Sequence, residues 1–561
     1  MTIPAIADLV VLGSGAAGLA AALRAAVAGA SVVVLEKSIW IGGTTAMSGG
    51  CIWIPDNPLM KAAGLADSFD DALAYLCAVA PPGWAEVEEP AWRAFLAHGP
   101  AMLSHLLAHT PLVLGLGGEP DPYLEATGAR RRGRNVSPRP LRFRDLGTWA
   151  TRIRPSPMPY RLTYDEITDT HLLARPSQAF TRFGPRLLWR TVTDRRAMGQ
   201  ALVGGLLSGC LRHGALVVAD ARALSLQRTG DRVDGVTVRY GGREHLVRAR
   251  RGIVIATGGF EWDPALMAVH HPGPHAWTAS PETNTGDGHR MAAAVGARLE
   301  RMDQALVMGT RPITYQGQPH AMPAADYTLP HSMIVDARGR RFVNEVQLNI
   351  GLGIDARDPV TGIRMHAPAW RIYDGRYARL YPHALPKGPE RVKAPSLRAL
   401  AARIGVDPVG LEAEAVRMSR FAREGRDEDF GRGSFGWDPG RNGDPRVRPN
   451  SCLGTIEEPP FYAFPLPVAF LGTKGGPRTD VSGRVIGQDG APIAGLFCAG
   501  LAMANAFGSK AVGAGTTLGP CLTWGYICAG TALDDEAPEA GRVSPARAAA
   551  TEPARDELPL H

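Results

Sequence analysis

The sequence predicts an α/β fold that opens with a strand, a helix and a second strand. Residues 9–12 (LVVL) form a short apolar run, which is typical of a buried parallel strand. The segment GSGAAG follows directly, and residues 19–28 are rich in alanine and other helix-forming residues. Residues 31–35 (SVVVL) form a second apolar run, which ends at Glu36. Together these observations predict a Rossmann-like unit.

The glycine spacing indicates where this unit holds a dinucleotide. Gly13, Gly15 and Gly18 stand in G-x-G-x-x-G spacing. The first allows the tight turn, the second lets the backbone approach a pyrophosphate at the helix N-terminus, and the third allows close helix–strand packing. Glu36 lies where an acid accepts hydrogen bonds from an adenosine ribose. Gly29 is placed to end the helix.

Composition narrows the class of protein. The chain has 561 residues, 45% of them hydrophobic and 20% charged, which predicts a globular protein of two or more domains. The net charge is +7, but no aromatic interleaving accompanies the arginine clusters, so we expect no nucleic-acid partner. Seven scattered cysteines without a C-x-x-C pair predict reduced thiols in a cytoplasmic protein with no metal site. The apolar stretch at 9–35 contains glycines and an arginine, so we expect no transmembrane segment.

A second loop of small residues indicates which of the two common dinucleotide cofactors, NAD or FAD, the chain binds. Residues 41–50 (IGGTTAMSGG) come soon after the ribose acid. Glycines and hydroxyl donors at this place suit a cofactor larger than NAD, with a ring system beyond its pyrophosphate. The sequence therefore predicts FAD.

These motifs resemble those of the flavoprotein family that contains fumarate reductases and 3-ketosteroid dehydrogenases, and residues 48–57 (SGGCIWIPDN) are most similar to the ketosteroid dehydrogenase branch. Further segments resemble the family in the same order: a strand at 215–224 (ALVVADARAL), then GIVIATGGF at 252–260, NTGDGH at 284–289 and GLFCAG at 495–500. The resemblance covers residues 9 to about 533 and implies non-covalent FAD. The implied cofactor-binding residues are Gly13, Ser14, Gly15, Ala16, Ala17, Gly18, Glu36, Lys37, Gly43, Thr44, Thr45, Ser48, Gly49, Gly50, Ala256, Thr257, Gly258, Asp287, Gly500, Thr517 and Leu518.

The resemblance also implies a domain plan. We expect a discontinuous FAD-binding domain at residues 1–270 and 450–535. An α+β catalytic cap domain at residues 271–449 is then inserted between its two parts. Residues 536–561 are rich in alanine, proline and charge, and we expect this tail to be disordered.

The segment GSKAVGAGTTLGP at 508–520 resembles the family frame G-x-x-Y-P-G-x-G-x-T-L-G-P. In ketosteroid dehydrogenases the tyrosine hydroxyl and a glycine N–H of this frame stabilise the enolate oxygen. Here Gly515 holds the place of the glycine, but Ala511 holds the place of the tyrosine. The loss of one such donor lowers a rate by about 10²–10³ unless another group replaces it.

The family's base is a tyrosine about four residues after an F-V-N-E motif. In this chain the motif is at 342–345, and Asn349 stands at the place of the base. A carboxamide cannot act as a base. A third family tyrosine, which supports the base, matches Tyr123 in the segment PDPYLE.

The resemblance implies a dehydrogenase that introduces a C=C bond next to the ketone of a 3-ketosteroid or related cyclic ketone. The hydride goes to flavin N5, and an external electron acceptor reoxidises the flavin. Besides Gly515 and Tyr123, the candidates for the missing roles are Lys510, Tyr327 and His331. Lys510 has a second interpretation, in which it only neutralises cofactor charge or reaches solvent. Three alternatives stay open: a 4-oxocyclohexanecarboxylate-type desaturase, a fumarate-reductase-like enzyme for an unsaturated acid, and an FAD-binding protein without catalysis.

Overall fold

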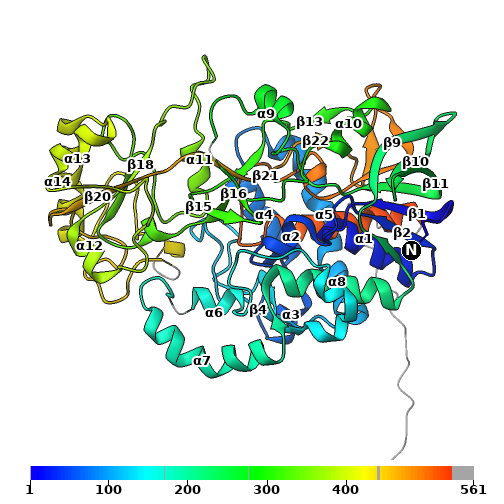
Figure 1. The fold of residues 1–561 in the computed structure, drawn as a ribbon, viewed down its shortest axis with the longest axis horizontal. Helices are drawn as coiled ribbons and strands as arrows, with labels where there is room; N and C mark the ends of the chain where they lie inside the picture. Colours follow the sequence, from blue (N-terminus) through cyan, green and yellow to red (C-terminus); the bar gives the residue numbers. More distant parts are fainter. Residues whose placement is uncertain (1, 170, 276, 439–441, 534–561) are drawn as a thin grey trace, which may run out of the picture.

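The computed structural model describes residues 2–533 except 170, 276 and 439–441. The predicted disordered tail at 536–561 lies outside the described residues. Figure 1 shows the sheet that contains β1 near one end of the long axis, and strands β18 and β20 with helices α12 to α14 near the other end.

The larger body is built on an eight-stranded sheet with the order β23-β24-β10-β11-β1-β2-β8, in which β9 also pairs with β10. Five of its strands run parallel: β1 (Ile6–Leu12), β2 (Val32–Leu35), β8 (Leu216–Val218), β11 (Arg243–Ile255) and β24 (Pro492–Cys498). The strands β9 (Arg222–Thr229), β10 (Arg232–Tyr240) and β23 (Arg484–Ile486) complete it. Because β24 pairs with β11, the two ends of the chain share one sheet. The predicted Rossmann-like, discontinuous α/β domain is confirmed.

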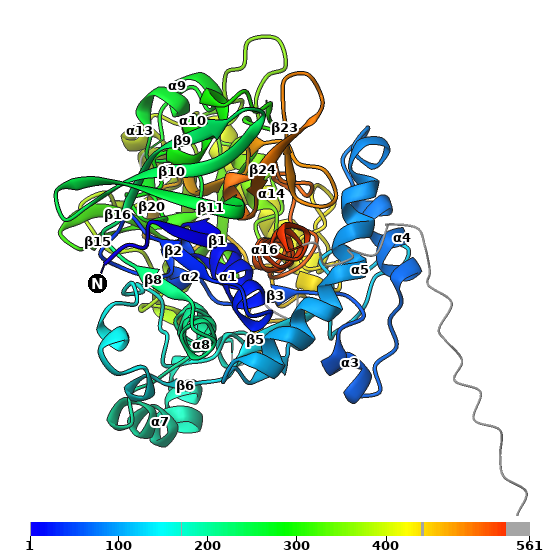
Figure 2. The same cartoon turned by 90° about the vertical axis from the view of Figure 1, so that its right-hand side faces the viewer.

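One helix layer on this sheet is formed by residues far apart in the sequence. Helix α1 (Ala16–Val27) packs against α16 (Leu518–Ala532) and α8 (Met198–Arg212), as Figure 2 shows. The close approach depends on small residues: a Cβ on Gly525 would lie 2.1 Å from the Ala17 carbonyl oxygen. Gly29 has a φ of +82° just after the helix, as expected for a residue that ends it.

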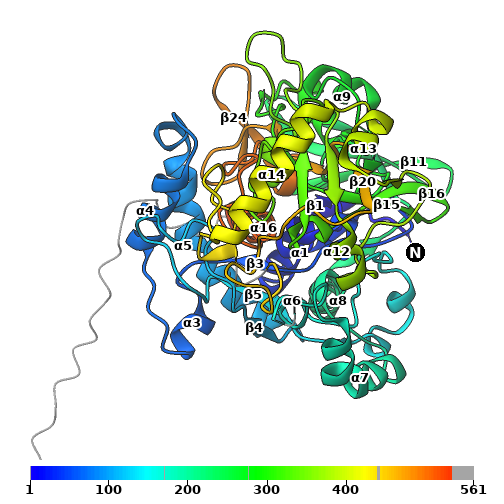
Figure 3. The ribbon, with the colours of Figure 1, turned by 90° about the vertical axis from the view of Figure 1, so that its left-hand side faces the viewer.

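The second body is the cap. A four-stranded antiparallel sheet has the order β17 (Ser332–Val335), β18 (Trp370–Tyr373), β20 (Phe461–Pro465) and β19 (Val392–Ala394). Apolar residues of this sheet pack with those of α13 (Leu397–Ile404) and α14 (Pro408–Glu424). Figure 3 shows the course of these two helices. A smaller sheet joins β12 (Trp277–Thr278), β21 (Ala469–Thr473) and β14 (Ala305–Val307). Strand pairing thus carries the cap sheets to residue 473, beyond the expected limit at 449.

The remaining elements lie around the two bodies. The predicted strand at 215–224 is interrupted at Asp220, whose φ is +59°, so β8 and β9 are separate. The other strands are β3 (Ile52–Trp53), β4 (Leu114–Leu116), β5 (Asn135–Pro138), β6 (Leu141–Arg142), β7 (Arg195–Arg196), β13 (Leu299–Glu300), β15 (Thr310–Tyr315), β16 (Gln318–Pro323) and β22 (Gly476–Pro477). The other helices are α2 (Gly43–Met47), α3 (Pro58–Ala62), α4 (Phe69–Val79), α5 (Ala85–His109), α6 (Tyr164–Thr168), α7 (Pro176–Val192), α9 (Pro264–His270), α10 (Asp287–Ala294), α11 (Ile350–Ile354) and α12 (Gly375–Leu380). Short 3₁₀ turns are η1 (Phe143–Thr151), η2 (Asp326–Thr328) and η3 (Gly500–Ala502).

Candidate active site

A cavity of about 390 Å³ begins at the carboxyl ends of the parallel strands, where open α/β sheets hold their ligands. All the predicted cofactor-binding residues except Gly18 line it. Gly18 has a packing role instead, because a Cβ there would lie 2.0 Å from the Gly13 carbonyl oxygen. We call the part around Glu36 the dinucleotide end and the part around Cys51, Ala511 and Gly515 the ring end.

Hydrogen bonds hold the dinucleotide end in shape. Ser14 donates from its N–H (3.0 Å) and its hydroxyl (2.7 Å) to Glu36 Oε2, and Gly42 N–H donates to Ser14 Oγ at 2.9 Å. Gly15 at the N-terminus of α1 has no capping side chain, and Thr45 Oγ1 accepts from the Ala16 N–H at 3.0 Å. Among the described residues, the buried Thr257 hydroxyl has no hydrogen-bond partner. A helix N-terminus, an unpartnered hydroxyl and an acid beside a glycine turn fit the pyrophosphate and ribose of FAD.

An ion pair joins the loop after β2 to the first residue of α10 at the dinucleotide end. Lys37 Nζ donates to Thr285 Oγ1 at 2.7 Å and to Asp287 Oδ2 at 3.1 Å, and Arg222 also contacts Asp287. Burial opposes the ionisation of Asp287, but the hydrogen bonds and charges of Arg222 and Lys37 hold its pKa below the ordinary value. Lys37 and Asp287 therefore face each other as charged groups on the cavity wall.

Gly515 lies in the wall of the ring end with a φ of +101°. The turn before it is fixed by Thr516, whose Oγ1 accepts from the N–H groups of Val512 (3.1 Å) and Gly513 (2.8 Å). Gly515 cannot carry a side chain here, since a Cβ would lie 2.6 Å from the Trp53 nitrogen. Within the described part of the chain, the Gly515 N–H donates to no acceptor. It is thus a backbone donor that remains open to a ligand.

The structure brings together three positions that the family motifs single out. Asn349 Nδ2 donates to the Tyr123 hydroxyl and to the Ala511 carbonyl oxygen, each at 2.8 Å. Ala511 N–H donates back to Asn349 Oδ1 at 2.7 Å. Ala511 lines the cavity, whereas Asn349 and Tyr123 lie behind it. The Asn349 side chain therefore links the cap to the C-terminal segment, at the position where a base was expected. We call these three hydrogen bonds the Asn349 clasp.

The other candidate residues lie away from the cavity. Lys510 Nζ donates to the Val79 carbonyl oxygen at 2.6 Å and lies 4.5 Å from the centre of the Tyr123 ring. Burial lowers the pKa of Lys510. Tyr327 is buried in the apolar core of the cap, and His331 Nδ1 is 2.8 Å from the Thr455 carbonyl oxygen. None of these three side chains is among the described residues that line the cavity.

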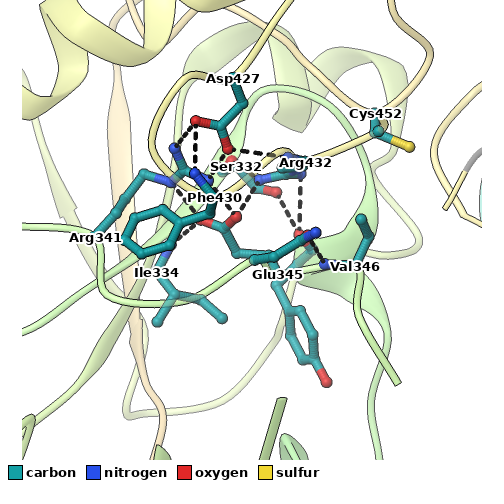
Figure 4. Close-up of polar contacts among 12 residues, drawn as sticks. Ser332, Ile334, Arg341, Glu345, Val346, Asp427, Phe430, Arg432 and Cys452 are labelled. Carbon is teal, nitrogen blue, oxygen red and sulfur yellow. Dashed lines mark hydrogen bonds and ion pairs between the residues drawn. The ribbon is translucent and has the colours of Figure 1, made fainter. Parts of the chain in front are cut away.

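The F-V-N-E motif has a structural part in the cap. Glu345 accepts two hydrogen bonds from Arg341, both at 2.8 Å, and pairs with Arg432 at 3.3 Å (Figure 4). Asp427 contacts the other side of Arg341 at 2.9 Å. Burial raises the pKa of Glu345, but Arg341 and Arg432 together bring it below the ordinary value. These residues fix the segment that leads from β17 to Asn349, and we call them the Glu345 network.

A buried lysine lies under the C-terminal segment. Lys474 is 1% exposed, and its Nζ donates to the Gly508 carbonyl oxygen at 2.7 Å. Burial lowers its pKa to about 8, although Cys521 acts in the opposite direction.

This shift predicts a pH dependence of stability. Between about pH 8 and the ordinary lysine pKa of 10.5, the unfolded chain holds a proton on Lys474 that the folded chain has lost. Unfolding then takes up a proton, so the free energy of unfolding rises with pH by at most about 1.4 kcal/mol per pH unit. We expect wild type to gain about 2 kcal/mol relative to Lys474→Met between pH 8 and pH 10. Urea unfolding at each pH measures the difference. The exposed Lys387→Met is the control, and equal profiles for wild type and Lys474→Met would refute the prediction.

Tyr164 is a cavity residue that no family motif singles out. Tyr164 is the first residue of α6 and lines the ring end. Its hydroxyl donates a hydrogen bond to the Glu119 carboxylate, with oxygen–oxygen distances of 3.1 and 3.2 Å. The sequence carries one local signal: Thr163 and Glu166 form a capping box, which marks the start of a helix. Such a signal places the helix but says nothing about which cavity it borders.

Among the described residues, no helix is long and apolar enough to cross a membrane, and no three histidine, cysteine or carboxylate side chains are arranged to hold a metal ion.

Comparisons with known proteins support the interpretation of this cavity as an FAD site. The family model described as an FAD binding domain matches residues 8–518, which confirms the predicted cofactor. The chain is 37% identical to a 3-oxosteroid 1-dehydrogenase of Mycobacterium tuberculosis (strain H37Rv), over 93% of this chain and 97% of that protein. It is also 37% identical to a 4-oxocyclohexanecarboxylate 2-dehydrogenase of Sinomonas cyclohexanicum, over 93% of this chain and 92% of that protein.

A solved structure extends the comparison to three dimensions. The 3-ketosteroid Δ1-dehydrogenase from Sterolibacterium denitrificans, in complex with 1,4-androstadiene-3,17-dione, superposes with a TM-score of 0.85 at 32% identity. The match covers 95% of this chain and all of that chain.

Proposed function

Because the chain belongs to the family of flavoproteins with an FAD binding domain, we propose that its cavity dehydrogenates a ring ketone. It is an FAD-dependent oxidoreductase that acts on CH–CH groups and introduces a C=C bond α,β to the ketone of a 3-ketosteroid or related cyclic ketone. The observation that carries this function is the open Gly515 N–H in the wall of the ring end.

FAD, when bound, accepts the hydride that leaves the β-carbon of the ketone. The dinucleotide end supplies the donors and the acid that hold the pyrophosphate and ribose. Small and apolar side chains at the ring end exclude water, which strengthens every hydrogen bond formed there. The Gly515 N–H donates to the ketone oxygen, where negative charge develops as the α-proton leaves.

The charges of the cavity favour a neutral ketone. Among the described residues that line it, the charged side chains are Glu36, Lys37 and Asp287, and all three lie at the dinucleotide end. Lys510, which would pair with a substrate carboxylate, donates instead to the Val79 carbonyl oxygen. A carboxylate in an apolar pocket without a cation is costly. We therefore place 3-ketosteroids ahead of 4-oxocyclohexanecarboxylate and of unsaturated dicarboxylic acids as substrates.

The function is tested by reduction of the bound flavin. The purified holoprotein is mixed without oxygen with androst-4-ene-3,17-dione, 4-oxocyclohexanecarboxylate or succinate, and the yellow flavin absorbance is followed. We expect the steroid to bleach the flavin, and an added artificial electron acceptor to restore the colour. Bleaching by succinate, or reoxidation of reduced flavin by fumarate, would instead indicate a fumarate-reductase-like enzyme. A flavin that none of the three compounds bleaches would overturn the proposed function.

A further inference from the structure

The proposed reaction needs a group that takes the α-proton, and Asn349 and Ala511 cannot supply one. Among the described cavity-lining residues outside the dinucleotide end, Tyr164 is the side chain that carries an acid–base group next to a carboxylate. We propose that Tyr164 is the catalytic base of this enzyme and that Glu119 positions it and receives its proton. The proposal rests on the proposed function and names the base of that same site.

The backbone around Tyr164 fixes its ring at the ring end. Tyr164 is the first residue of α6, directly after Thr163, whose side chain accepts from Glu166 N–H at 3.1 Å. Its ring packs on the loop at the end of α2, because a Cβ on Gly49 would lie 3.1 Å from Tyr164 Cδ2. It also belongs to a small apolar cluster with Cys51, Leu348, Trp437 and Ala514. Two of these neighbours adjoin residues of the expected catalytic frame. Leu348 precedes Asn349, which stands at the place of the base, and Ala514 precedes Gly515, which is the donor to the ketone oxygen.

Glu119 is set up as a proton acceptor for the phenol. Glu119 is buried, with 9% of the residue exposed. Both of its carboxylate oxygens accept a hydrogen bond from the Tyr164 hydroxyl. Asn135 of β5 also donates to Glu119 Oε2 at 3.2 Å, which holds the carboxylate in place. A carboxylate that accepts the phenol's hydrogen bond increases the negative charge on the phenol oxygen, as a positioned base does for a nucleophile.

The tyrosine expected from the family motif has a different environment. The Tyr123 oxygen accepts from the Asn349 amide at 2.8 Å, and Tyr123 does not line the described cavity. Burial raises the pKa of Tyr123, although the Asn349 hydrogen bond lowers it. Tyr123 therefore stabilises the Asn349 clasp, while the cavity phenol with a carboxylate partner is Tyr164.

The proposed step balances with FAD as the oxidant. The α-carbon–hydrogen bond breaks and its proton passes to the Tyr164 oxygen, while the Tyr164 proton passes to Glu119. The electron pair forms the C=C bond as the β-carbon loses a hydride to FAD. The ketone loses two electrons and two hydrogens, FAD gains the hydride, and Glu119 ends the step protonated. The Gly515 N–H stabilises the oxygen during this change.

The test compares Tyr164→Phe, Glu119→Gln and the double variant with wild type. Each holoprotein is reduced without oxygen by saturating androst-4-ene-3,17-dione, and the rate constant of flavin bleaching is measured. The dissociation constant of the steroid is measured separately, from its perturbation of the oxidised flavin spectrum at times before bleaching. Tyr160→Phe is the matched control, because Tyr160 lies four residues away and does not line the cavity.

Tyr164→Phe is expected to lower the rate constant by about 10²–10⁴ while steroid binding changes by no more than about twofold. Glu119→Gln is expected to lower the rate constant with full FAD content, and the double variant is expected to be no slower than Tyr164→Phe, because residues that act as a unit are not additive. Tyr160→Phe stays at the wild-type rate.

Three results would overturn the assignment: a Tyr164→Phe rate within about twofold of wild type, losses that add fully in the double variant, or a loss explained by weaker steroid binding. A wild-type flavin that the steroid and 4-oxocyclohexanecarboxylate both leave oxidised would overturn the proposed function itself, and the assignment of Tyr164 would fall with it.

Discussion

Replacing Glu345 with glutamine will lower the free energy of unfolding by about 3–5 kcal/mol, the cost of removing one partner from a buried ion pair. Arg341 and Arg432 are both completely buried beside Glu345. The amide keeps the shape of the side chain but removes its charge. Arg341 then keeps Asp427 as a carboxylate partner, whereas the Arg432 guanidinium loses its ion pair with Glu345 and keeps hydrogen bonds to backbone carbonyl oxygens. Denaturant unfolding, with the midpoint and the slope fitted separately, measures the loss.

Glu428→Gln is the matched control for this change. Glu428 lies on the surface and pairs with Arg420 at 2.8 Å, where solvent screens the interaction. We expect the control to leave the unfolding midpoint unchanged. If Glu345→Gln also unfolds at the wild-type midpoint, the network does not stabilise the cap in the way proposed here.

Gly13→Ala will abolish stable FAD binding while leaving the cap folded. Gly13 has a φ of +104°, and a Cβ there would lie 2.3 Å from the Ala256 carbonyl oxygen. A strained φ alone costs about 1–3 kcal/mol, and β1 or β11 must also move to remove the overlap. We expect FAD affinity to fall by more than about 100-fold. The flavin-to-protein ratio after purification and a titration of apoprotein with FAD measure this change.

Gly184→Ala serves as the control for the added methyl group. No atom lies within 4 Å of the Cβ position at Gly184, and its φ is not in the left-handed region. This variant should purify with the wild-type amount of FAD. A Gly13→Ala protein as yellow as wild type would show that the turn adjusts more freely than its contacts indicate.

The dinucleotide end was predictable because its determinants are local. The run at 9–12, the glycines at 13, 15 and 18, and Glu36 all belong to one strand–helix–strand segment, which the structure forms as β1, α1 and β2, and Gly13, Gly15 and Glu36 line the cavity. The strand at 215–224 was predicted as continuous but divides at Asp220, since its apolar pattern contains no signal for a left-handed residue. The domain boundaries stay predictions, although strand pairing carries the cap to residue 473.

The ring end was less predictable because its residues meet only in three dimensions. Lys510 stands next to Ala511 in the sequence, but the fold gives the two residues different surroundings. Ala511 lines the cavity while Lys510 contacts the end of α4. Glu119 and Tyr164 lie 45 residues apart in the chain, in segments without regular periodicity, so only the folded structure brings them together.

The pairing of β24 with β11, and of α16 with α1, also sets the order in which the protein can mature on the ribosome. Strand β11 ends at Ile255, but its neighbour β24 begins at Pro492, after the whole cap has been made. At about 5–20 residues per second, the emerging chain waits roughly 10–50 s for this neighbour. During that interval the nucleotide-binding half exposes an unfinished sheet edge, which is a site for chaperones or for aggregation. We therefore expect flavin loading to be a late event in biosynthesis, and we expect a chain truncated before residue 492 to stay an apoprotein.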